Sequence, residues 1–178
     1  MFKIEYQWLE LIWTLIPCLL LVVIGTPSLI YLYQSENFVE NPRLTIHVIG
    51  HQWYWTYEYK DFNELTFDSY IIPILSLKEG IYRLLEVDNH LILPFQIFVR
   101  FLVSSADVLH SFALPRIGIK VDANPGRLNQ IISIREFPQI VFGQCSEICG
   151  ANHRFIPIVI EFSNISLFLN WIKIFSQL

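Results

Sequence analysis

A long uncharged stretch near the N-terminus constrains the fold of this chain more than any other feature. Residues 11–35 contain no charged side chain and consist mainly of Leu, Ile, Val and aromatic residues. A helix needs about 20 apolar residues to cross the hydrocarbon core of a bilayer, and this run is too long and too uniformly apolar for a buried helix. Trp8 and Trp13 at one end, with Tyr31 and Tyr33 at the other, match interfacial aromatic belts. Residues 1–41 therefore predict one transmembrane helix, which contacts the lipid bilayer, and a linker.

Composition narrows the functional classes further. Of the 178 residues, 53% are hydrophobic, and the formal net charge is −4. This weakly acidic balance gives no electrostatic basis for nucleic-acid binding and leaves room for a basic partner. The three cysteines do not form a disulfide framework. Cys18 lies in the apolar run, where it is expected to pack as a small hydrophobe.

The hydrophobic period changes to two after a short polar linker, which predicts β-structure over residues 42–162. Turn signals and the absence of a long helical pattern between the runs favour an antiparallel sandwich or barrel. The expected strands cover residues 44–48, 52–59, 82–87, 96–103, 118–122, 130–134 and 156–162.

The last segment, residues 163–178, predicts an amphipathic helix. Ser163 and Asn164 can cap a helix that runs to about Gln177. Its apolar side is expected to lie against the sandwich, another subunit or the membrane surface.

A short loop near the C-terminal end carries three candidate metal ligands. Cys145 and Cys149 are four positions apart, and His153 follows after another four. Thiolates and imidazoles suit copper or zinc, whereas the carboxylate of Glu147 suits a harder ion. Taken alone, the loop is equally compatible with a disulfide or two core cysteines. His110, which follows an expected strand, is the best candidate for a fourth donor, ahead of the other three histidines: His47, His51 and His90.

Several segments resemble cytochrome c oxidase subunit II, in particular its mitochondrially encoded members. The resemblance is carried by residues 50–55 (GHQWYW), 102–110, 144–159, 83–89 and 125–130. It extends with few gaps from about Trp8 to the C-terminal helix.

This resemblance implies an all-β, cupredoxin-like Greek-key sandwich holding a dinuclear copper A centre. Cys145 and Cys149 would each bridge both copper ions, and His110 and His153 would each complete one of them. The backbone carbonyl of Glu147 would be a weak copper ligand, while its side chain would face a magnesium ion shared with subunit I.

The resemblance also implies a function and a location. The chain would accept electrons from reduced cytochrome c and pass them to the haem- and copper-containing subunit I, where oxygen is reduced and protons are pumped. It would sit in the mitochondrial inner membrane with its copper domain in the intermembrane space. No haem ligands are recognisable in this sequence, so oxygen reduction itself is expected in subunit I.

Further residues take roles from the same resemblance. Trp53 would receive the electron from cytochrome c, with Tyr54 and Trp55 on the same strand, and Glu10 would stand at the entrance of a proton pathway into subunit I. Without the resemblance, these aromatic residues would be read as core. Four acidic residues match the docking surface for cytochrome c: Glu58, Glu64, Asp68 and Asp107.

Two features depart from the family pattern. The family has two transmembrane helices, and this sequence begins just before the second. Either the N-terminal part is missing from this sequence, or the subunit is shortened or encoded in pieces. The axial methionine ligand is expected at position 156, where this chain has Ile. Either the copper next to His110 lacks its axial donor, or a mitochondrial Met codon has been read as Ile. The single Met in the chain favours the second explanation.

Two other functions use parts of the same pattern. A membrane-anchored copper carrier could use the same ligands, but it would not need Trp53 or the acidic residues. A quinol oxidase subunit II shares the fold without copper, and Cys145, Cys149 and His153 argue against it.

Overall fold

The structure is a computed structural model that describes residues 5–36, 41–62 and 65–175. The chain divides into two compact units, Met1–Glu40 and Asn41–Leu178. The expected docking residue Glu64 and the expected helix end at Gln177 lie outside the described residues.

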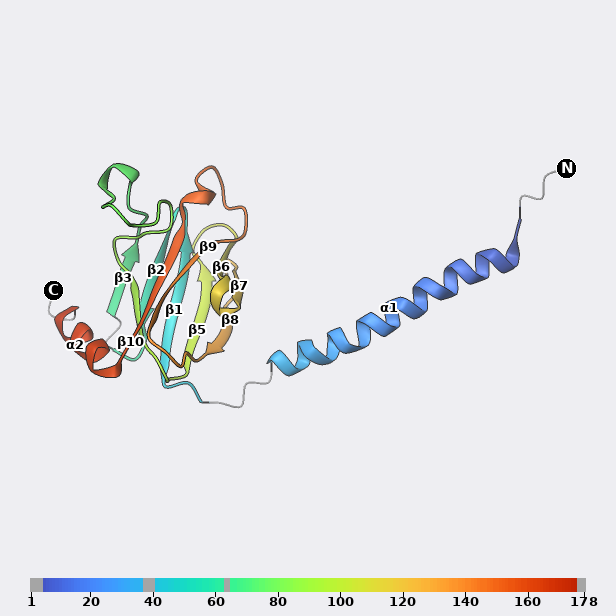
Figure 1. Cartoon of the computed structure of the whole chain (residues 1–178), viewed down its shortest axis with the longest axis horizontal. Helices are drawn as coiled ribbons and strands as arrows, with labels where there is room; N and C mark the ends of the chain where they lie inside the picture. The colour runs from blue at the N-terminus through green and yellow to red at the C-terminus, as the bar shows by residue number, and fades with distance from the viewer. Residues whose placement is uncertain (1–4, 37–40, 63–64, 176–178) are drawn as a thin grey trace. The chain divides into compact units, whose positions relative to one another are not determined.

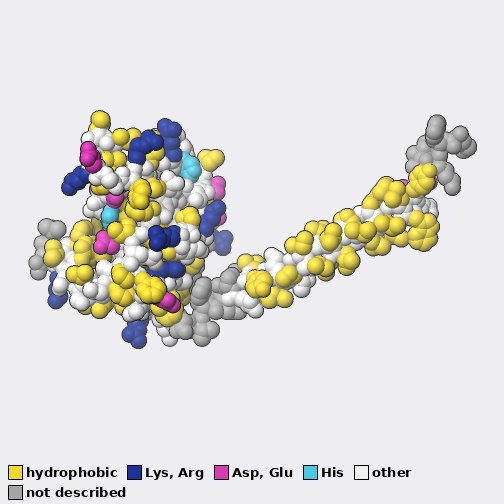
Figure 2. Space-filling model, in the orientation of Figure 1, with side chains coloured by type: hydrophobic (Ala, Val, Ile, Leu, Met, Phe, Trp, Pro, Cys, Tyr) yellow, Lys and Arg dark blue, Asp and Glu magenta, His cyan; other side chains and the backbone are white. Residues whose placement is uncertain are grey.

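The N-terminal unit contains the long helix α1, Gln7–Glu36. Hydrophobic side chains cover it along its length (Figure 2), and these side chains are exposed in the isolated chain. The hydroxyls of Thr14 and Thr26 donate to the carbonyl oxygens of Glu10 and Val22, both at 2.8 Å, so these polar groups are satisfied within the helix. Within the described residues, α1 alone is long and apolar enough to cross a bilayer, which agrees with the expected single span.

The second unit is a sandwich of two five-stranded sheets, seen in Figure 1. The first sheet has the order β3 (Leu65–Ser69), β2 (Tyr54–Tyr59), β1 (Leu44–His51), β5 (Val99–Ser105) and β8 (Asn129–Ser133). The second has the order β4 (Leu91–Pro94), β10 (Pro157–Ser163), β9 (Gln139–Cys145), β6 (His110–Leu114) and β7 (Ile119–Ala123). Short 3-10 turns occupy Ile74–Ser76, Pro115–Ile117 and His153–Phe155.

The core lies between the two sheets, where alternate residues of each strand point inward. Ile46 and Val48 of β1 and Phe101 of β5 are buried from one side, and Phe112 of β6 and Ile158 of β10 from the other. The expected all-β sandwich is therefore confirmed. It is not purely antiparallel, because β1 pairs with β5, and β10 with β4, in parallel.

Helix α2, Ile165–Phe175, follows the last strand and packs on the sandwich. The side-chain oxygen of Asn164 accepts a hydrogen bond from the Leu167 amide at 2.9 Å, which is the expected N-cap. Phe168 and Trp171 pack against the aromatic ring of Tyr59, at centroid distances of 6.2 and 5.5 Å.

The strand prediction was wrong in two respects. Residues 82–87 form turns that end in a single bridge at Val87, and Leu84 has a left-handed φ of 67° that a strand cannot contain. Four strands were missed altogether: β3, β4, β6 and β9.

Candidate metal centre

Pairing between β6 and β9 brings the distant histidine to the cysteine loop. Phe112 of β6 lies opposite Cys145, the last residue of β9, so His110 at the start of β6 stands beside Cys145. Cys149 lies in the loop that follows β9, and His153 opens the 3-10 turn after that loop. Two strands, one loop and a 3-10 turn therefore bring the four predicted ligands together.

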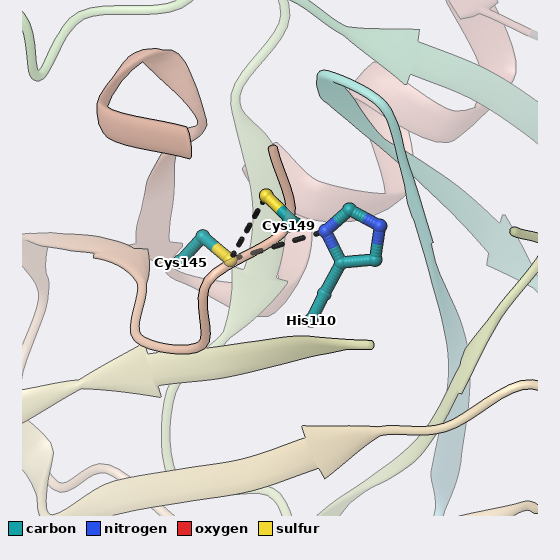
Figure 3. Close-up of side chains that lie close together, drawn as sticks. All are labelled: His110, Cys145 and Cys149. Carbon is teal, nitrogen blue, oxygen red and sulfur yellow. Dashed lines mark hydrogen bonds between the residues drawn. The ribbon is translucent and has the colours of Figure 1, made fainter. Parts of the chain in front are cut away.

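The four donor atoms form a continuous chain. His110 Nδ1 lies 3.9 Å from Cys145 Sγ, the two Sγ atoms are 3.9 Å apart, and Cys149 Sγ lies 3.6 Å from His153 Nδ1. Figure 3 shows the first three of these side chains converging. The ligand atoms of His110, Cys145 and Cys149 all lie within 4.8 Å of one another, and all three residues are buried.

These distances fit a metal better than a disulfide. A disulfide requires a sulfur–sulfur distance of about 2.05 Å, and the observed 3.9 Å leaves both cysteines free. Because 3.9 Å is less than twice a metal–sulfur bond of about 2.3 Å, one ion can contact both sulfurs. His110 and His153 approach different sulfurs, so each imidazole can serve a different ion.

Two further groups predicted from the family pattern lie beside the cysteines. The backbone oxygen of Glu147 is 3.3 Å from Cys145 Sγ, while its side chain belongs to an exposed residue. Ile156 is buried, and its backbone oxygen accepts a hydrogen bond from the Cys145 amide at 3.1 Å. The backbone of Ile156, the residue at the position where the resemblance predicts a methionine, is therefore hydrogen-bonded to that of Cys145.

The two thiols differ in acidity in the metal-free chain. Burial alone would raise the pKa of Cys145, but hydrogen bonds from His110 and from the backbone at Glu147 and Ser111 lower it to about 6. Burial and the charge of Cys145 raise the pKa of Cys149 to about 12. The free pair therefore holds one negative charge at neutral pH, and metal binding to both sulfurs must release the remaining proton.

Asp107 orients the His110 ring through the ring nitrogen that does not face the cysteines. Its Oδ1 lies 2.8 Å from His110 Nε2, which leaves Nδ1 facing the sulfurs. Burial would lower the pKa of His110, but hydrogen bonds with Cys145 and Asp107 raise it. Asp107 was predicted only as a docking residue, although its position three residues before His110 is a local signal for this contact.

The aromatic residues occupy different environments. Trp53 lies in the turn before β2 and not on the strand, so the expectation that it shares a strand with Tyr54 and Trp55 was wrong. A side-chain carbon added to Gly150 would lie 3.4 Å from two atoms of the Trp53 ring, so this ring lies against the ligand loop directly after Cys149. Trp55 is fully buried and packs edge-on against His110 at 5.9 Å.

Tyr54 belongs to a stack of rings near the same turn. It stacks with His51 and with Tyr70, at a centroid distance of 4.5 Å in each case. Tyr54 and Tyr70 also line a cleft of about 440 Å³ together with Gln52, Trp53, Ile71, Asn152 and Phe155.

The predicted acidic residues do not form one cluster with the ligands. Glu58 and Asp68 lie on the outer face of the first sheet, where Glu58 pairs with Lys60 and His47, and Asp68 accepts a hydrogen bond from Thr56. Asp107 lies beside the metal centre instead. Glu10 lies on α1, in the other unit.

The histidines considered less suitable as ligands have other partners. His47 bonds Glu58 and Ser104, and His90 lies between Glu86 and Glu161. His51 stacks on Tyr54. None of the three joins the His–Cys group found within the described part of the chain.

Gln52 was not identified from the sequence as a site residue. Its side-chain amide donates to the backbone oxygen of Cys149 at 2.8 Å, and its backbone N–H donates to Asp107 Oδ2 at 2.7 Å. The sequence carries no spacing signal for these contacts, because they join residues 97 and 55 positions apart.

The family models and the curated relatives that match this chain all belong to one protein family. Residues 44–163 match the family model for the periplasmic domain of cytochrome c oxidase subunit II, and residues 1–30 match the model for its transmembrane domain. Cytochrome c oxidase subunit 2 of Choristoneura rosaceana is 53% identical over 98% of this chain and 77% of the relative. The corresponding protein of Yponomeuta malinellus is 51% identical, over 99% of this chain and 77% of the relative.

Solved structures agree with the sequence comparisons. The periplasmic domain of subunit II of cytochrome oxidase from Bradyrhizobium japonicum has a TM-score of 0.73 and 40% identity, covering 79% of this chain and 98% of that one. A subunit II of cytochrome c oxidase in a mixed-disulfide intermediate with a thioredoxin-like protein has a TM-score of 0.68 and 39% identity, covering 80% of this chain and 96% of that one. With its apolar helix, its cupredoxin-like sandwich and a His–Cys group that could hold a metal, the chain belongs to the cytochrome c oxidase subunit II family.

Proposed function

We propose that this chain is the electron-accepting subunit of its oxidase: it takes electrons from reduced cytochrome c and passes them to subunit I, where oxygen is reduced. The observation that carries the proposal is the chain of four donors, His110, Cys145, Cys149 and His153, with successive contacts of 3.6–3.9 Å. The two sulfurs stand close enough together for a metal to contact both.

The residues present fit a pair of copper ions. Cys145 and Cys149 would bridge the two ions, His110 and His153 would each complete one, and the carbonyl of Glu147 would be a weak further ligand. When bound, such a pair supplies a one-electron acceptor whose charge is shared between two metals. The protein contributes rigidity: Cys145 is held by the β6–β9 pairing, and His110 by Asp107. Ligands held in this way move little on reduction, which keeps the reorganisation energy low.

Trp53 is proposed as the residue that receives the electron. Its ring lies against Gly150, directly after the ligand Cys149, and it is half-buried beside an open cleft. An electron arriving at this ring has only the ligand loop to cross. Glu58 and Asp68 would attract a basic partner and raise its association rate, and Glu64 is proposed to join them.

We also propose roles for Glu147 and Glu10 and a location for the chain in the membrane. The exposed Glu147 side chain would hold a magnesium ion shared with subunit I, and Glu10 would stand at the entrance of a proton pathway. Helix α1 would anchor the chain in the mitochondrial inner membrane, with the β unit in the intermembrane space. The insect relatives and the transmembrane family match support this setting.

Reduction of the copper-loaded full chain by cytochrome c, followed under anaerobic conditions by stopped-flow absorption, tests the proposal. Trp53→Leu should slow reduction at least about tenfold, equivalent to about 1.4 kcal/mol of activation free energy, while the copper spectrum stays unchanged. Trp171→Phe on α2 is the matched control and should react at the wild-type rate. Raising the salt concentration should slow the wild-type reaction, because exposed charges are screened.

Three outcomes would count against this function. A loaded wild-type chain that cytochrome c cannot reduce would instead fit a copper carrier. A chain that binds no copper would fit a copper-free quinol oxidase subunit. Equal rates for Trp53→Leu and wild type would remove Trp53 from the electron route.

A further inference from the structure

The end of β1 and the turn that follows it lie against the two ligand-bearing segments of the candidate metal centre. At Gly50 there is no space for a side chain, because an added carbon would lie 2.9 Å from Cδ2 of the His110 ring. At Gly150, an added carbon would lie 3.1 Å from Nε2 of Gln52. Glycine is needed at Gly150 for a second reason, because its φ is +122°. Gly50 thus lets the end of β1 approach His110, and Gly150 lets the cysteine loop approach the turn.

Gln52, a residue of this turn, connects His110 and the cysteine loop by hydrogen bonds. On the histidine side the connection runs through Asp107, whose Oδ1 bonds His110 Nε2 and whose Oδ2 accepts the backbone N–H of Gln52. The side-chain amide of Gln52 then donates to the backbone oxygen of Cys149 at 2.8 Å. The resulting chain runs from His110 through Asp107 and Gln52 to Cys149. Because a carbonyl oxygen only accepts, Gln52 must present its NH₂ group to Cys149.

The two cysteines are held in different ways, and this difference gives Gln52 its importance. Cys145 ends β9, its amide donates to the Ile156 oxygen at 3.1 Å, and the next amide, that of Ser146, donates to the Ser111 oxygen at 3.0 Å. The strand ladder therefore fixes Cys145. Cys149 is a buried residue in the loop beyond the strand, and its backbone oxygen accepts a hydrogen bond from the side chain of the exposed Gln52. Loss of that donor would remove the side-chain hydrogen bond that holds the loop to the turn at Cys149.

We propose that Gln52 is a positioning residue for the metal centre, which fixes Cys149 relative to His110 and so sets the separation of the two sulfurs. This inference rests on the proposed function for its role in metal binding. Its structural part, the hold of Gln52 on the ligand loop, is measurable without metal. Groups that orient metal ligands from outside contribute about 10- to 100-fold to metal affinity.

Two variants of Gln52 and one control test the proposal in the full chain in detergent. Gln52→Leu removes the donor at similar size, and Gln52→Glu replaces the NH₂ with an oxygen that cannot donate when ionised. Both keep the backbone N–H that bonds Asp107. Gln130→Leu makes the same chemical change at an exposed position on β8, away from the ligands.

The first measurement is amide hydrogen exchange of residues 147–155 in the copper-free chain. Both Gln52 variants should raise exchange in this loop about tenfold, while β1 and β10 keep their wild-type protection and Gln130→Leu changes nothing. The second is the rate at which a chelator removes copper from the loaded chain, which should rise about 10- to 100-fold in the Gln52 variants only.

The exchange and copper-release measurements each support or overturn the proposed role of Gln52. Loop exchange or copper loss at the wild-type rate in the Gln52 variants overturns the proposal. Exchange that rises throughout the sandwich overturns it as well, because Gln52 would then support the fold in general. A wild-type chain that binds no copper pair contradicts the proposed function, while the exchange result still judges the contact between Gln52 and the loop.

Discussion

Single residues determine how each donor atom of the centre is aimed. His110 directs Nδ1 at the sulfurs because Asp107 occupies its Nε2, and Cys145 is acidified by the groups around it. Cys145, Cys149 and His153 could be predicted from their spacing, because they lie within nine residues of one another. His110 required the assumption of a distant fourth donor, and Gln52 could not be predicted because only the fold brings it to Cys149.

Ile156 stands where the resemblance to the family predicts an axial methionine ligand. It is buried and its backbone bonds that of Cys145, so Ile156→Met would put a thioether on the residue expected to carry that ligand. A thioether donates electron density and stabilises the oxidised copper, and axial ligands tune copper potentials. Ile156→Met should therefore lower the reduction potential, by on the order of 60 mV, a tenfold change in the equilibrium of a one-electron couple.

Redox titration of the loaded chain measures this shift. A potential that is identical in the two proteins would show that residue 156 does not act on the copper. The mass of the peptide that follows Arg154, taken from the native source, determines separately whether position 156 is Ile or Met in the native protein.

Glu58 contributes to stability in a pH-dependent way. Partial burial alone would raise the pKa of Glu58, but hydrogen bonds from Lys60 and His47 outweigh burial and lower it. A lowered pKa means that the folded state favours the carboxylate, so the contribution is present above the ordinary Glu pKa of about 4.3. It is lost as the pH falls through the lowered value.

Denaturation of the copper-free chain tests this sign. Glu58→Gln should reduce the free energy of unfolding at pH 7 by about 0.5–1 kcal/mol, and the difference should vanish in acid. A difference that stays constant down to acid pH would show that the charge of Glu58 is not its cause.

At the scale of elements, strands of the sandwich position the metal ligands at one end, and helix α2 packs against the opposite end of the sandwich. Figure 1 shows α2 at the end of the sheets away from the orange loop that carries Cys149 and His153. Phe168 is fully buried among aromatic rings, with Phe62 at 5.7 Å and Tyr59 at 6.2 Å. Helix α2 therefore stabilises the fold without contacting the metal centre.

Phe168→Ala should lower the free energy of unfolding by about 3–5 kcal/mol, because it leaves a cavity in this cluster. Leu167→Ala, one position earlier and 59% exposed, should change it by no more than about 0.5 kcal/mol. Chemical denaturation of the copper-free chain compares the two. Equal losses would mean that α2 is not docked through its Phe168 face.

The sequence predicted the elements whose pattern is local. Alternation located β1, β2 and most of β5, because one face of each is buried and the other is partly exposed. All five residues of β6 are buried, so it shows no alternation and was missed. Parallel pairing of β1 with β5 could not be predicted, since it depends on which distant strands meet. The residues of the false strand at 82–87 lie in turns, where Tyr82 packs on Phe142.

The whole molecule joins an apolar helix and a sandwich with a candidate metal site in one chain. Each unit matches its own part of the subunit II family, and the charges lie on the sandwich while α1 is almost free of them (Figure 2). A membrane-anchored sandwich with a candidate metal site is consistent with the proposed role in electron transfer at a membrane surface.

In the proposed function, the cysteine pair and the two histidines hold two copper ions that share an electron. Copper content and electron paramagnetic resonance of the oxidised full chain test this most directly, with Cys149→Ser as the comparison. We expect two copper ions per chain and a multi-line spectrum from an electron shared between them, both lost in Cys149→Ser. One copper ion per chain with the spectrum of an isolated ion, or a spectrum unchanged by Cys149→Ser, would contradict the proposal.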